Sequence, residues 1–268
     1  CVARKGGVIL CELESFGSQV LEHNFTVTAK PYFSLLNRTW SQAKYFKSYK
    51  FDLWHSYHYS DDYTEPLIAR LAGAKAWVYT KKSMMWESRA WIVKSFLATR
   101  IVADNPDMLD LFFNKFGFGK KTRIIVHGIP LNDYFPNPKK INKIRRNYNI
   151  PDDNILIACV AHLVPVKDHS TLIDAVSRIE NVHLFLAGYF GDKSYIMNLK
   201  NQIKILNLSK RVHFLGSIED ITEFLNQMDI KVLPSKREAF GVALIEAMAC
   251  CLPCIASDIS GPRDIIEE

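Results

Sequence analysis

Strand-like and helix-like segments alternate throughout the second half of this chain, and this alternation constrains the fold more than any other feature of the sequence. Five short, mainly apolar runs are typical of buried strands: 154–161, 182–188, 211–216, 229–235 and 253–258. Helical segments separate them: 168–179, 193–208, 219–227 and a run that starts near Gly241 and includes Glu246. Buried strands joined by helices of this length need parallel crossovers, so we predict a doubly wound α/β sheet.

The first half has the same rhythm in a less regular form. Its candidate strands are 24–29, 51–57, 74–80, 99–105 and 122–128, with helical segments at 64–73 and 106–117. A chain of 268 residues exceeds the usual domain size of roughly 100 to 200 residues, and two prolines in a polar stretch mark a linker near residues 135–140. We therefore predict two Rossmann-like α/β domains, residues 1–137 and 138–268. They would face each other across a cleft, because ligands of such sheets bind beyond the carboxyl ends of the strands.

Both ends of the sequence look cut. The chain begins at Cys1 rather than Met and stops at Glu268, shortly after a strand-like run. No apolar run approaches the roughly 18 residues of a membrane span, and no signal peptide is visible. We therefore expect a truncated, cytoplasmic protein whose first strand and C-terminal end are missing.

Positive charge is concentrated in the first half. Residues 1–137 hold 18 of the 34 Lys and Arg but only 12 of the 28 Asp and Glu, and residues 138–268 hold 16 of each. This imbalance indicates either an anionic partner, such as a membrane surface or a phosphate-bearing substrate, or ordinary solubility. No nucleic-acid partner is expected.

One segment of the first half, residues 30–51, interleaves basic and aromatic side chains. They are Lys30, Arg38, Lys44, Lys47 and Lys50, with Phe33, Trp40, Tyr45, Phe46 and Tyr49. This composition suits an interfacial helix at the inner face of an anionic membrane. The alternative is a set of aromatic core residues with solvated lysines.

Two short motifs resemble redox or metal sites. Cys251 and Cys254 form a Cys-x-x-Cys pair, which is either redox-active or a pair of small apolar residues at a helix end and in a buried strand. His55 and His58 have no third candidate ligand nearby in the sequence, so a structural or polar role is favoured over a metal. We expect no metal ion and no cofactor.

Four predicted strands of the second half are followed by a residue able to contact a ligand. His162 and Lys167 follow the first strand, Gly188 the second, Ser217 the third and Glu238 the fourth. Because ligands of such sheets bind at the carboxyl ends of the strands, we expect these residues to line one site.

Glu246 is a lone carboxylate in the apolar run 242–250, where an unpaired charge is costly unless a partner satisfies it. The helix start near Gly241 offers free backbone N–H groups to a phosphate, and the glycine allows close approach. Glu246 could accept both hydroxyls of a ribose, while Lys167 would meet the same diphosphate as a point charge. The alternatives are an internal ion pair for Glu246, a solvated helix-start lysine at Lys167 and an ordinary loop acid at Glu238.

These residues carry a resemblance to a known family. Glu238 and Glu246 are separated by seven residues that include Phe-Gly, and "EAMACCLPCIASDISGPRDII" follows. This pattern closely resembles the donor domain of the retaining GT-B glycosyltransferases of family 4, the glycosyl transferases group 1. "VAHLVPVKDHSTLIDA" is similar to that family's Gly-Arg-Leu-x-x-x-Lys loop, "VHFLG" to its base-binding strand end, and "RIIVHGIPLNDYFPNP" to the run that enters its linker.

The resemblance implies roles for the matching positions. Glu246 would hold the ribose hydroxyls and Lys167 the donor phosphates, and the catalytic residues would be Glu238 and Lys167. Together with Glu238, a stretch of backbone would contact the donor sugar and the distal phosphate: Phe240, Gly241 and Val242. The remaining donor-site positions lie at strand ends and in a glycine-rich loop: His162, Gly188, Ser217, Gly6 and Gly7.

Some positions depart from the family pattern. Ala161 and His162 stand where the family usually has Gly and Arg, which weakens the second phosphate contact or makes it pH-dependent. Lys82 replaces the His that lies near the sugar, and Cys251 replaces a usual Gly. These departures imply low activity for the chain as it stands.

The resemblance thus implies a retaining glycosyltransferase that moves a sugar from a nucleotide-diphosphate sugar to a glycan or lipid-linked acceptor, in cell-surface polysaccharide biosynthesis. No general base is visible, and the departing phosphate would assist attack on the same face of the sugar. The alternatives are a nucleotide-sugar epimerase of the same architecture and a non-catalytic nucleotide-sugar-binding partner.

Overall fold

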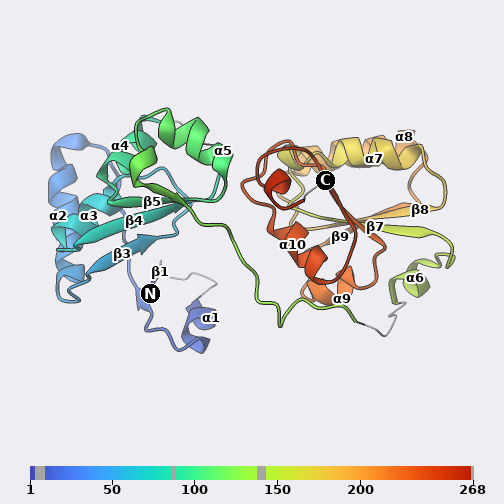
Figure 1. The fold of residues 1–268 in the computed structure, drawn as a ribbon, viewed down its shortest axis with the longest axis horizontal. Helices are drawn as coiled ribbons and strands as arrows, with labels where there is room; N and C mark the ends of the chain where they lie inside the picture. The colour runs from blue at the N-terminus through green and yellow to red at the C-terminus, as the bar shows by residue number, and fades with distance from the viewer. Residues whose placement is uncertain (4–9, 86–87, 138–142, 267–268) are drawn as a thin grey trace. The chain divides into compact units, whose positions relative to one another are not determined.

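The computed structural model describes residues 1–3, 10–85, 88–137 and 143–266, and it divides into two compact units (Figure 1). Unit 1 is Cys1–Ile125 and unit 2 is Val126–Glu268. The prolines near residue 137 had suggested a later division. Residues 133–137 lie with unit 2 because side chains of unit 2, including those of Thr222 and Asn226, bond to their backbone.

Unit 1 contains a four-stranded parallel sheet. Its strands are β3 (Leu53–Ser56), β4 (Ala76–Lys81), β5 (Arg100–Ala103) and β6 (Thr122–Ile124), in that order. Its longer helices are α2 (Leu35–Lys47), α3 (Thr64–Leu71) and α4 (Arg89–Leu97). A short helix, α5 (Pro106–Met108), continues as a π-helix over Leu109–Asn114. The strands predicted at 51–57, 74–80, 99–105 and 122–128 are confirmed, and so are both predicted helical segments.

A separate parallel pair of short strands lies at the start of unit 1. It joins β1 (Val2–Ala3) to β2 (Leu21–Glu22), and α1 (Leu10–Ser15) lies between them in the sequence. Gly6 and Gly7 lie outside the described residues.

The strand predicted at 24–29 is wrong, because this segment has no regular secondary structure and belongs to no sheet. Its backbone groups bond to side chains instead of to a neighbouring strand. The N–H of Val27 donates to Oγ1 of Thr64 at 3.1 Å, and the Arg38 guanidinium donates to the carbonyls of Thr28 and Ala29.

Unit 2 is built on a five-stranded parallel sheet in the order β11-β10-β7-β8-β9. The strands are β7 (Ile155–Val160), β8 (Val182–Ala187), β9 (Val212–Gly216), β10 (Ile230–Leu233) and β11 (Cys254–Ala256). All five predicted strands are confirmed. The chain adds β8 and β9 on one side of β7 and then β10 and β11 on the other, which is the doubly wound order. The topological switch therefore lies between β7 and β10.

Helices cover both faces of this sheet (Figure 1). Alternate residues of β7 point to opposite faces: Ile157 and Cys159 pack with α7 (His169–Ser177) and α8 (Lys193–Ile205), whereas Leu156 and Ala158 pack with α9 (Ile221–Leu225) and α10 (Val242–Ala249). A shorter helix, α6 (Lys143–Tyr148), precedes β7. Because both faces are buried, the strands read as continuous apolar runs in the sequence.

Among the described residues, no helix is long and apolar enough to cross a membrane.

Candidate functional site

The loops that follow β7 and β10 meet at the switch between these strands. A 3-10 turn, Pro165–Lys167, follows β7, and residues 234–241 connect β10 to α10. The two loops are joined by their backbones, since the N–H of Lys236 donates to the carbonyl of Val166 at 2.8 Å. In open α/β sheets the crevice at such a switch is the usual ligand site.

Lys167 and Glu238, predicted from separate strand ends, lie together in this crevice. Nζ of Lys167 donates to Oε2 of Glu238, and both side chains are largely buried, with 20% and 16% of their surface exposed. The hydroxyl of Ser235 donates to the same carboxylate oxygen at 3.3 Å. The site therefore contains a lysine ammonium whose partner in the structure is a carboxylate from the neighbouring loop.

The start of α10 lies directly after this loop. Gly241 is the residue before the first helical turn and has a φ of +106°, a left-handed conformation that favours glycine. The first N–H groups of an α-helix have no partner within the helix, so the start of α10 can donate to an anion. The preceding Phe240 is buried and lies against Gly261, where an added Cβ would come within 2.6 Å of the Phe240 carbonyl oxygen.

Glu246 lies further along α10 and is half-buried. Its Oε1 accepts a hydrogen bond of 2.9 Å from the hydroxyl of Tyr134, which is 112 residues earlier in the chain. Burial and the Glu246 carboxylate together raise the pKa of Tyr134 to about 12, so this hydroxyl remains a donor at neutral pH. The partner of Glu246 in the structure is thus a neutral donor.

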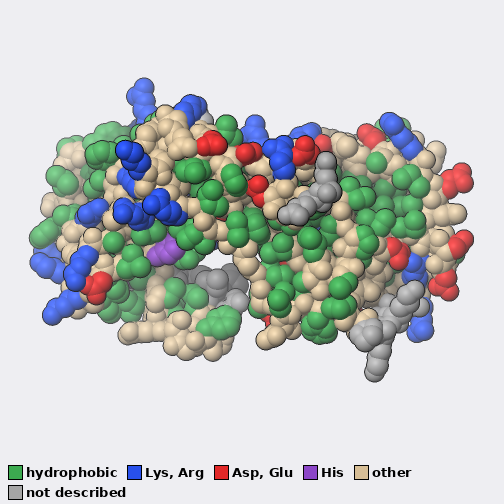
Figure 2. All heavy atoms as spheres, in the orientation of Figure 1, with side chains coloured by type: hydrophobic (Ala, Val, Ile, Leu, Met, Phe, Trp, Pro, Cys, Tyr) green, Lys and Arg blue, Asp and Glu red, His purple; other side chains and the backbone are tan. Residues whose placement is uncertain are grey.

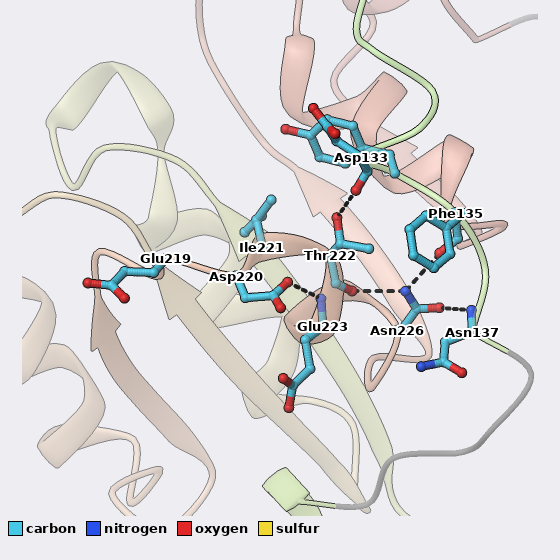
Figure 3. Close-up of a pocket in the computed structure, with 10 residues that line it drawn as sticks. Asp133, Phe135, Asn137, Glu219, Asp220, Ile221, Thr222, Glu223 and Asn226 are labelled. Atoms are coloured by element: carbon cyan, nitrogen blue, oxygen red, sulfur yellow. Dashed lines mark hydrogen bonds between the residues drawn. The ribbon is translucent and has the colours of Figure 1, made fainter. Parts of the chain in front are cut away.

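Tyr134 also lines a pocket of about 650 Å³ between residues 133–137 and α9 (Figure 3). Four carboxylates lie around the pocket: Asp133, Glu219, Asp220 and Glu223. Asp220 accepts from the N–H of Glu223 at the start of α9, and Glu223 pairs with Lys143. The acidic lining disfavours a phosphate here, whereas the Lys167 side of unit 2 favours one.

The other predicted residues of unit 2 lie at the strand ends, as expected. His162 is exposed after β7, and its ring lies edge-on to that of Tyr189. Gly188 follows β8 at a φ of +146°, and an added Cβ would lie 2.0 Å from the carbonyl oxygen of Ala161. Ser217 is exposed after β9, and Val242 is the first residue of α10.

Lys82 lies in unit 1, directly after β4. Its Nζ lies over the ring of Tyr57 at 4.8 Å from the ring centroid. His55, one strand away, contacts the hydroxyl of Thr80 at 3.0 Å. Burial, with a smaller effect of Lys82, lowers the pKa of His55.

Two buried basic groups lie beside the switch and were not predicted. Lys231, in β10, has no exposed surface, and its Nζ donates to the carbonyl of Val160 at 3.3 Å. Burial lowers the pKa of Lys231. His169 is also buried at the start of α7, neither ring nitrogen has a hydrogen-bond partner among the described residues, and burial lowers its pKa to about 4.

Within the described ranges, no three His, Cys, Asp or Glu side chains lie close enough together to hold a metal ion. Cys254 lies half-buried in β11, and Cys251 is exposed in the turn after α10. These positions, at a helix end and in a strand, are the ones expected if Cys251 and Cys254 are small apolar residues rather than a redox-active pair. Both cysteines are free.

The sequence analysis missed four residues at or beside this site: Tyr134, Ser235, Lys231 and His169. Ser235 stands at the end of a predicted strand, three residues before Glu238, and could have been chosen on that basis. Lys231 interrupts an apolar strand, which is a visible anomaly. No sequence pattern links Tyr134 to Glu246.

Comparison with known proteins finds a family that is similar to most of unit 2. Residues 140–268 match the family described as Glycosyl transferases group 1. The O-antigen biosynthesis glycosyltransferase WclY of Escherichia coli is 33% identical over 139 residues, which cover 52% of this chain and 38% of WclY. An E. coli UDP-Gal:alpha-D-GlcNAc-diphosphoundecaprenol alpha-1,3-galactosyltransferase is 27% identical over 243 residues, 85% of this chain and 63% of that enzyme.

Solved structures match nearly the whole chain. The crystal structure of Anabaena HepE in complex with UDP and glucose superposes with a TM-score of 0.82 at 23% identity, covering 100% of this chain and 75% of HepE. The chain spans less than two thirds of the length of the two curated relatives named above. The likeness to HepE shows the fold, and the family match covers nearly all of unit 2. This chain therefore has the GT-B fold, and its residues 140–268 match the glycosyl transferases group 1.

Proposed function

We propose that this chain is part of a retaining glycosyltransferase that moves a sugar from a nucleotide-diphosphate sugar to a glycan or lipid-linked acceptor. The observation that carries the proposal is the convergence of Lys167, Glu238 and the start of α10 at the switch of unit 2. Two relatives support it by their names: HepE was solved with UDP and glucose, and the E. coli galactosyltransferase uses a diphosphoundecaprenol-linked acceptor. The proposed setting is cell-surface polysaccharide biosynthesis.

The donor would lie along the carboxyl ends of the strands of unit 2. Its diphosphate would bind the ammonium of Lys167 and the free N–H groups at the start of α10. Its ribose would bind Glu246, and its base would lie toward Ser217. This orientation is consistent with the acidic pocket beside Tyr134, because the uncharged nucleoside would lie nearer to that pocket than the diphosphate.

Donor binding would change the partner of Lys167. In the structure the ammonium is paired with Glu238, and a diphosphate carries more negative charge than one carboxylate. The phosphates would replace Glu238 at Lys167, and the released carboxylate could accept hydrogen bonds from the sugar. Phe240, Gly241 and Val242 would contact the sugar through their backbone, and His162 and Gly188 would border the phosphates.

The chemical step would break the bond between the sugar C1 and the phosphate oxygen and form a bond from C1 to the acceptor oxygen on the same face. The acceptor proton would pass to the departing phosphate. Lys167 and the start of α10 would stabilise the charge that develops on the leaving group. The proposal needs no side-chain general base and no metal ion.

The test is incubation of the protein with UDP-, GDP- and ADP-sugars, with and without an undecaprenyl-diphosphate-linked sugar, followed by mass spectrometry. Transfer to the acceptor with retention of the anomeric configuration supports the proposal. Interconversion of free nucleotide-sugars without transfer would instead indicate an epimerase. Tight nucleotide binding with no turnover would indicate a non-catalytic binding protein.

We also propose a cytoplasmic location at the inner face of an anionic membrane, with unit 1 in contact with the lipid. Phe33, Leu36 and Trp40 are spaced as one stripe along α2 and the turn before it, and they are 91%, 72% and 45% exposed. Nζ of Lys47 lies 5.9 Å from the centroid of the Trp40 ring, and Lys and Arg side chains gather over this unit (Figure 2). Exposed aromatic and aliphatic side chains beside lysines suit the interface of an anionic bilayer. Phe46 is fully buried, so it belongs to the core of unit 1.

Co-sedimentation with vesicles tests this surface. The wild type should bind vesicles that contain phosphatidylglycerol, less so at high salt, and Phe33→Ser with Trp40→Ser should weaken binding. Binding that is insensitive to anionic lipid, to salt and to both substitutions would contradict the membrane contact.

A further inference from the structure

Tyr134 makes a contact with Glu246 that the proposed donor site does not yet use. Its hydroxyl lies 2.9 Å from Oε1 of Glu246 and donates to it. Tyr134 precedes β7 in the sequence, whereas Glu246 is on α10. The bond therefore joins the segment that enters unit 2 to the helix of the proposed donor site.

The segment that carries Tyr134 is fixed on both sides of the tyrosine (Figure 3). Before it, the carbonyl of Asp133 accepts from the hydroxyl of Thr222 at 2.6 Å. After it, the carbonyl of Phe135 accepts from Nδ2 of Asn226 at 3.0 Å, and the N–H of Asn137 donates to Oδ1 of Asn226 at 2.6 Å. Three hydrogen bonds to α9 and the residue after it thus hold the backbone from which Tyr134 reaches Glu246.

One hydrogen bond leaves most of the Glu246 carboxylate free. An ionised carboxylate accepts about four hydrogen bonds, and Tyr134 uses one of them. The free side chain of a glutamate has several rotamers, and fixing one of them before a ligand arrives reduces the entropy lost on binding. Among the residues that the structure describes, Tyr134 is the only hydrogen-bond donor to this carboxylate, so Oε2 and the remaining lone pair of Oε1 stay available to a ligand.

We propose that Tyr134 is a positioning residue that orients Glu246 to accept both hydroxyls of the donor ribose. This proposal rests on the proposed function, because it assumes that Glu246 binds the ribose. Two other roles make different predictions. A purely structural tyrosine would affect every ligand of unit 2 alike, and a tyrosine that competes with the ribose for Glu246 would weaken binding.

The experiment is calorimetric titration of the wild type, Tyr134→Phe and Tyr148→Phe with UDP and with 2′-deoxy-UDP, or with the matching GDP or ADP pair if one of those binds more tightly. Tyr134→Phe removes only the hydroxyl, so it should weaken binding of the ribonucleotide about 3- to 10-fold, the size of one hydrogen bond. Binding of the 2′-deoxy nucleotide, which cannot use both hydroxyls, should fall less. Tyr148, a half-exposed tyrosine of unit 2 that packs on Phe185, is the control for the same chemical change and should behave as the wild type.

The outcomes separate this proposal from the proposed function. Unchanged or tighter ribonucleotide binding by Tyr134→Phe overturns the positioning role and leaves the donor site intact. Equal losses for the ribo- and deoxynucleotide also overturn it, because they indicate a structural role. If the wild type binds none of UDP, GDP and ADP, the proposed function fails, and the positioning role is overturned with it.

Discussion

Lys231→Met is expected to stabilise unit 2, because the wild-type chain buries a lysine in the centre of its sheet. The side chain has no exposed surface, and its ammonium donates to one carbonyl, that of Val160, at the long distance of 3.3 Å. Replacing a buried ion pair with apolar side chains of similar volume is often neutral or stabilising by about 1 to 4 kcal/mol, and the same desolvation argument applies to a buried lysine. Methionine has nearly the length of lysine, so we expect a gain of about 1 to 2 kcal/mol at pH 7, from the lower part of that range.

The gain should depend on pH. Burial lowers the pKa of Lys231 from 10.5 in the folded state, so between the folded and the unfolded pKa the unfolded chain binds more protons. The free energy of unfolding of the wild type therefore rises with pH through this window. The penalty of burying the charge is present in full below the folded pKa and is lost above the unfolded pKa. The advantage of Lys231→Met should accordingly shrink as the pH is raised toward 10.5.

Urea unfolding can resolve this effect within one unit. All five tryptophans lie in residues 1–125, so tryptophan fluorescence reports unit 1 and serves as an internal control. Hydrogen-exchange mass spectrometry of peptides from 154–256 reports unit 2. Lys236→Met, at a lysine with 65% of its side chain exposed, should change stability by less than about 0.5 kcal/mol. A Lys231→Met protein that is less stable than the wild type at pH 7, or whose advantage does not narrow at high pH, would refute the reasoning.

Two further predictions concern the site directly. Lys167→Ala should weaken binding of a nucleoside diphosphate by about 1.5 to 3 kcal/mol and binding of the nucleoside very little, since a charge-assisted contact to phosphate is lost. Isothermal titration measures both affinities, with Lys236→Ala as the control, and equal losses for the two ligands would reject the phosphate role. Gly188→Ala should destabilise unit 2 by about 1 to 3 kcal/mol, because the new methyl would lie 2.0 Å from the Ala161 carbonyl oxygen. Gly73→Ala is the control in thermal unfolding, because Gly73 has a φ of +93° but no atom within 4 Å of the added Cβ, so it reports backbone strain without crowding. If Gly188→Ala loses no more stability than Gly73→Ala, the crowding argument is contradicted.

The fold of unit 2 was predictable because its strands are buried on both faces. Each of them appears as a short apolar run that a helix with clear spacing separates from the next. The order of residues along these runs also indicated the strand ends, and Lys167 and Glu238 were expected at one site for that reason. The structure brings these two side chains into contact.

Unit 1 was harder to predict because local composition does not determine pairing. Polar and apolar residues alternate over 24–29 as they do in a strand, but the backbone of this segment forms hydrogen bonds with the side chains of Thr64 and Arg38. Whether such a segment joins a sheet depends on neighbours that are distant in the sequence. The exposure of Phe33 and the burial of Phe46, 13 residues later, likewise depend on how α2 packs against α3.

The contact between Tyr134 and Glu246 could not be predicted for the same reason. The two residues are 112 positions apart, and each has an ordinary explanation in its own segment. The lone carboxylate in an apolar run correctly indicated that a partner was needed. Which partner satisfies it depends on the path of residues 133–137 over α9, which the structure supplies.

The most direct test of the account is calorimetric titration of Glu246→Gln with the nucleoside diphosphate that binds the wild type most tightly among UDP, GDP and ADP. Glutamine keeps the shape of the side chain and an oxygen that can accept from Tyr134, but it removes the charge. We predict a melting temperature within a few degrees of the wild type and a loss of about 1.5 to 3 kcal/mol in nucleotide affinity, the value of a hydrogen bond to a charged group. A strongly destabilised variant whose folded fraction binds the nucleotide normally would instead show that Glu246 has a structural role, and it would contradict the proposed donor site.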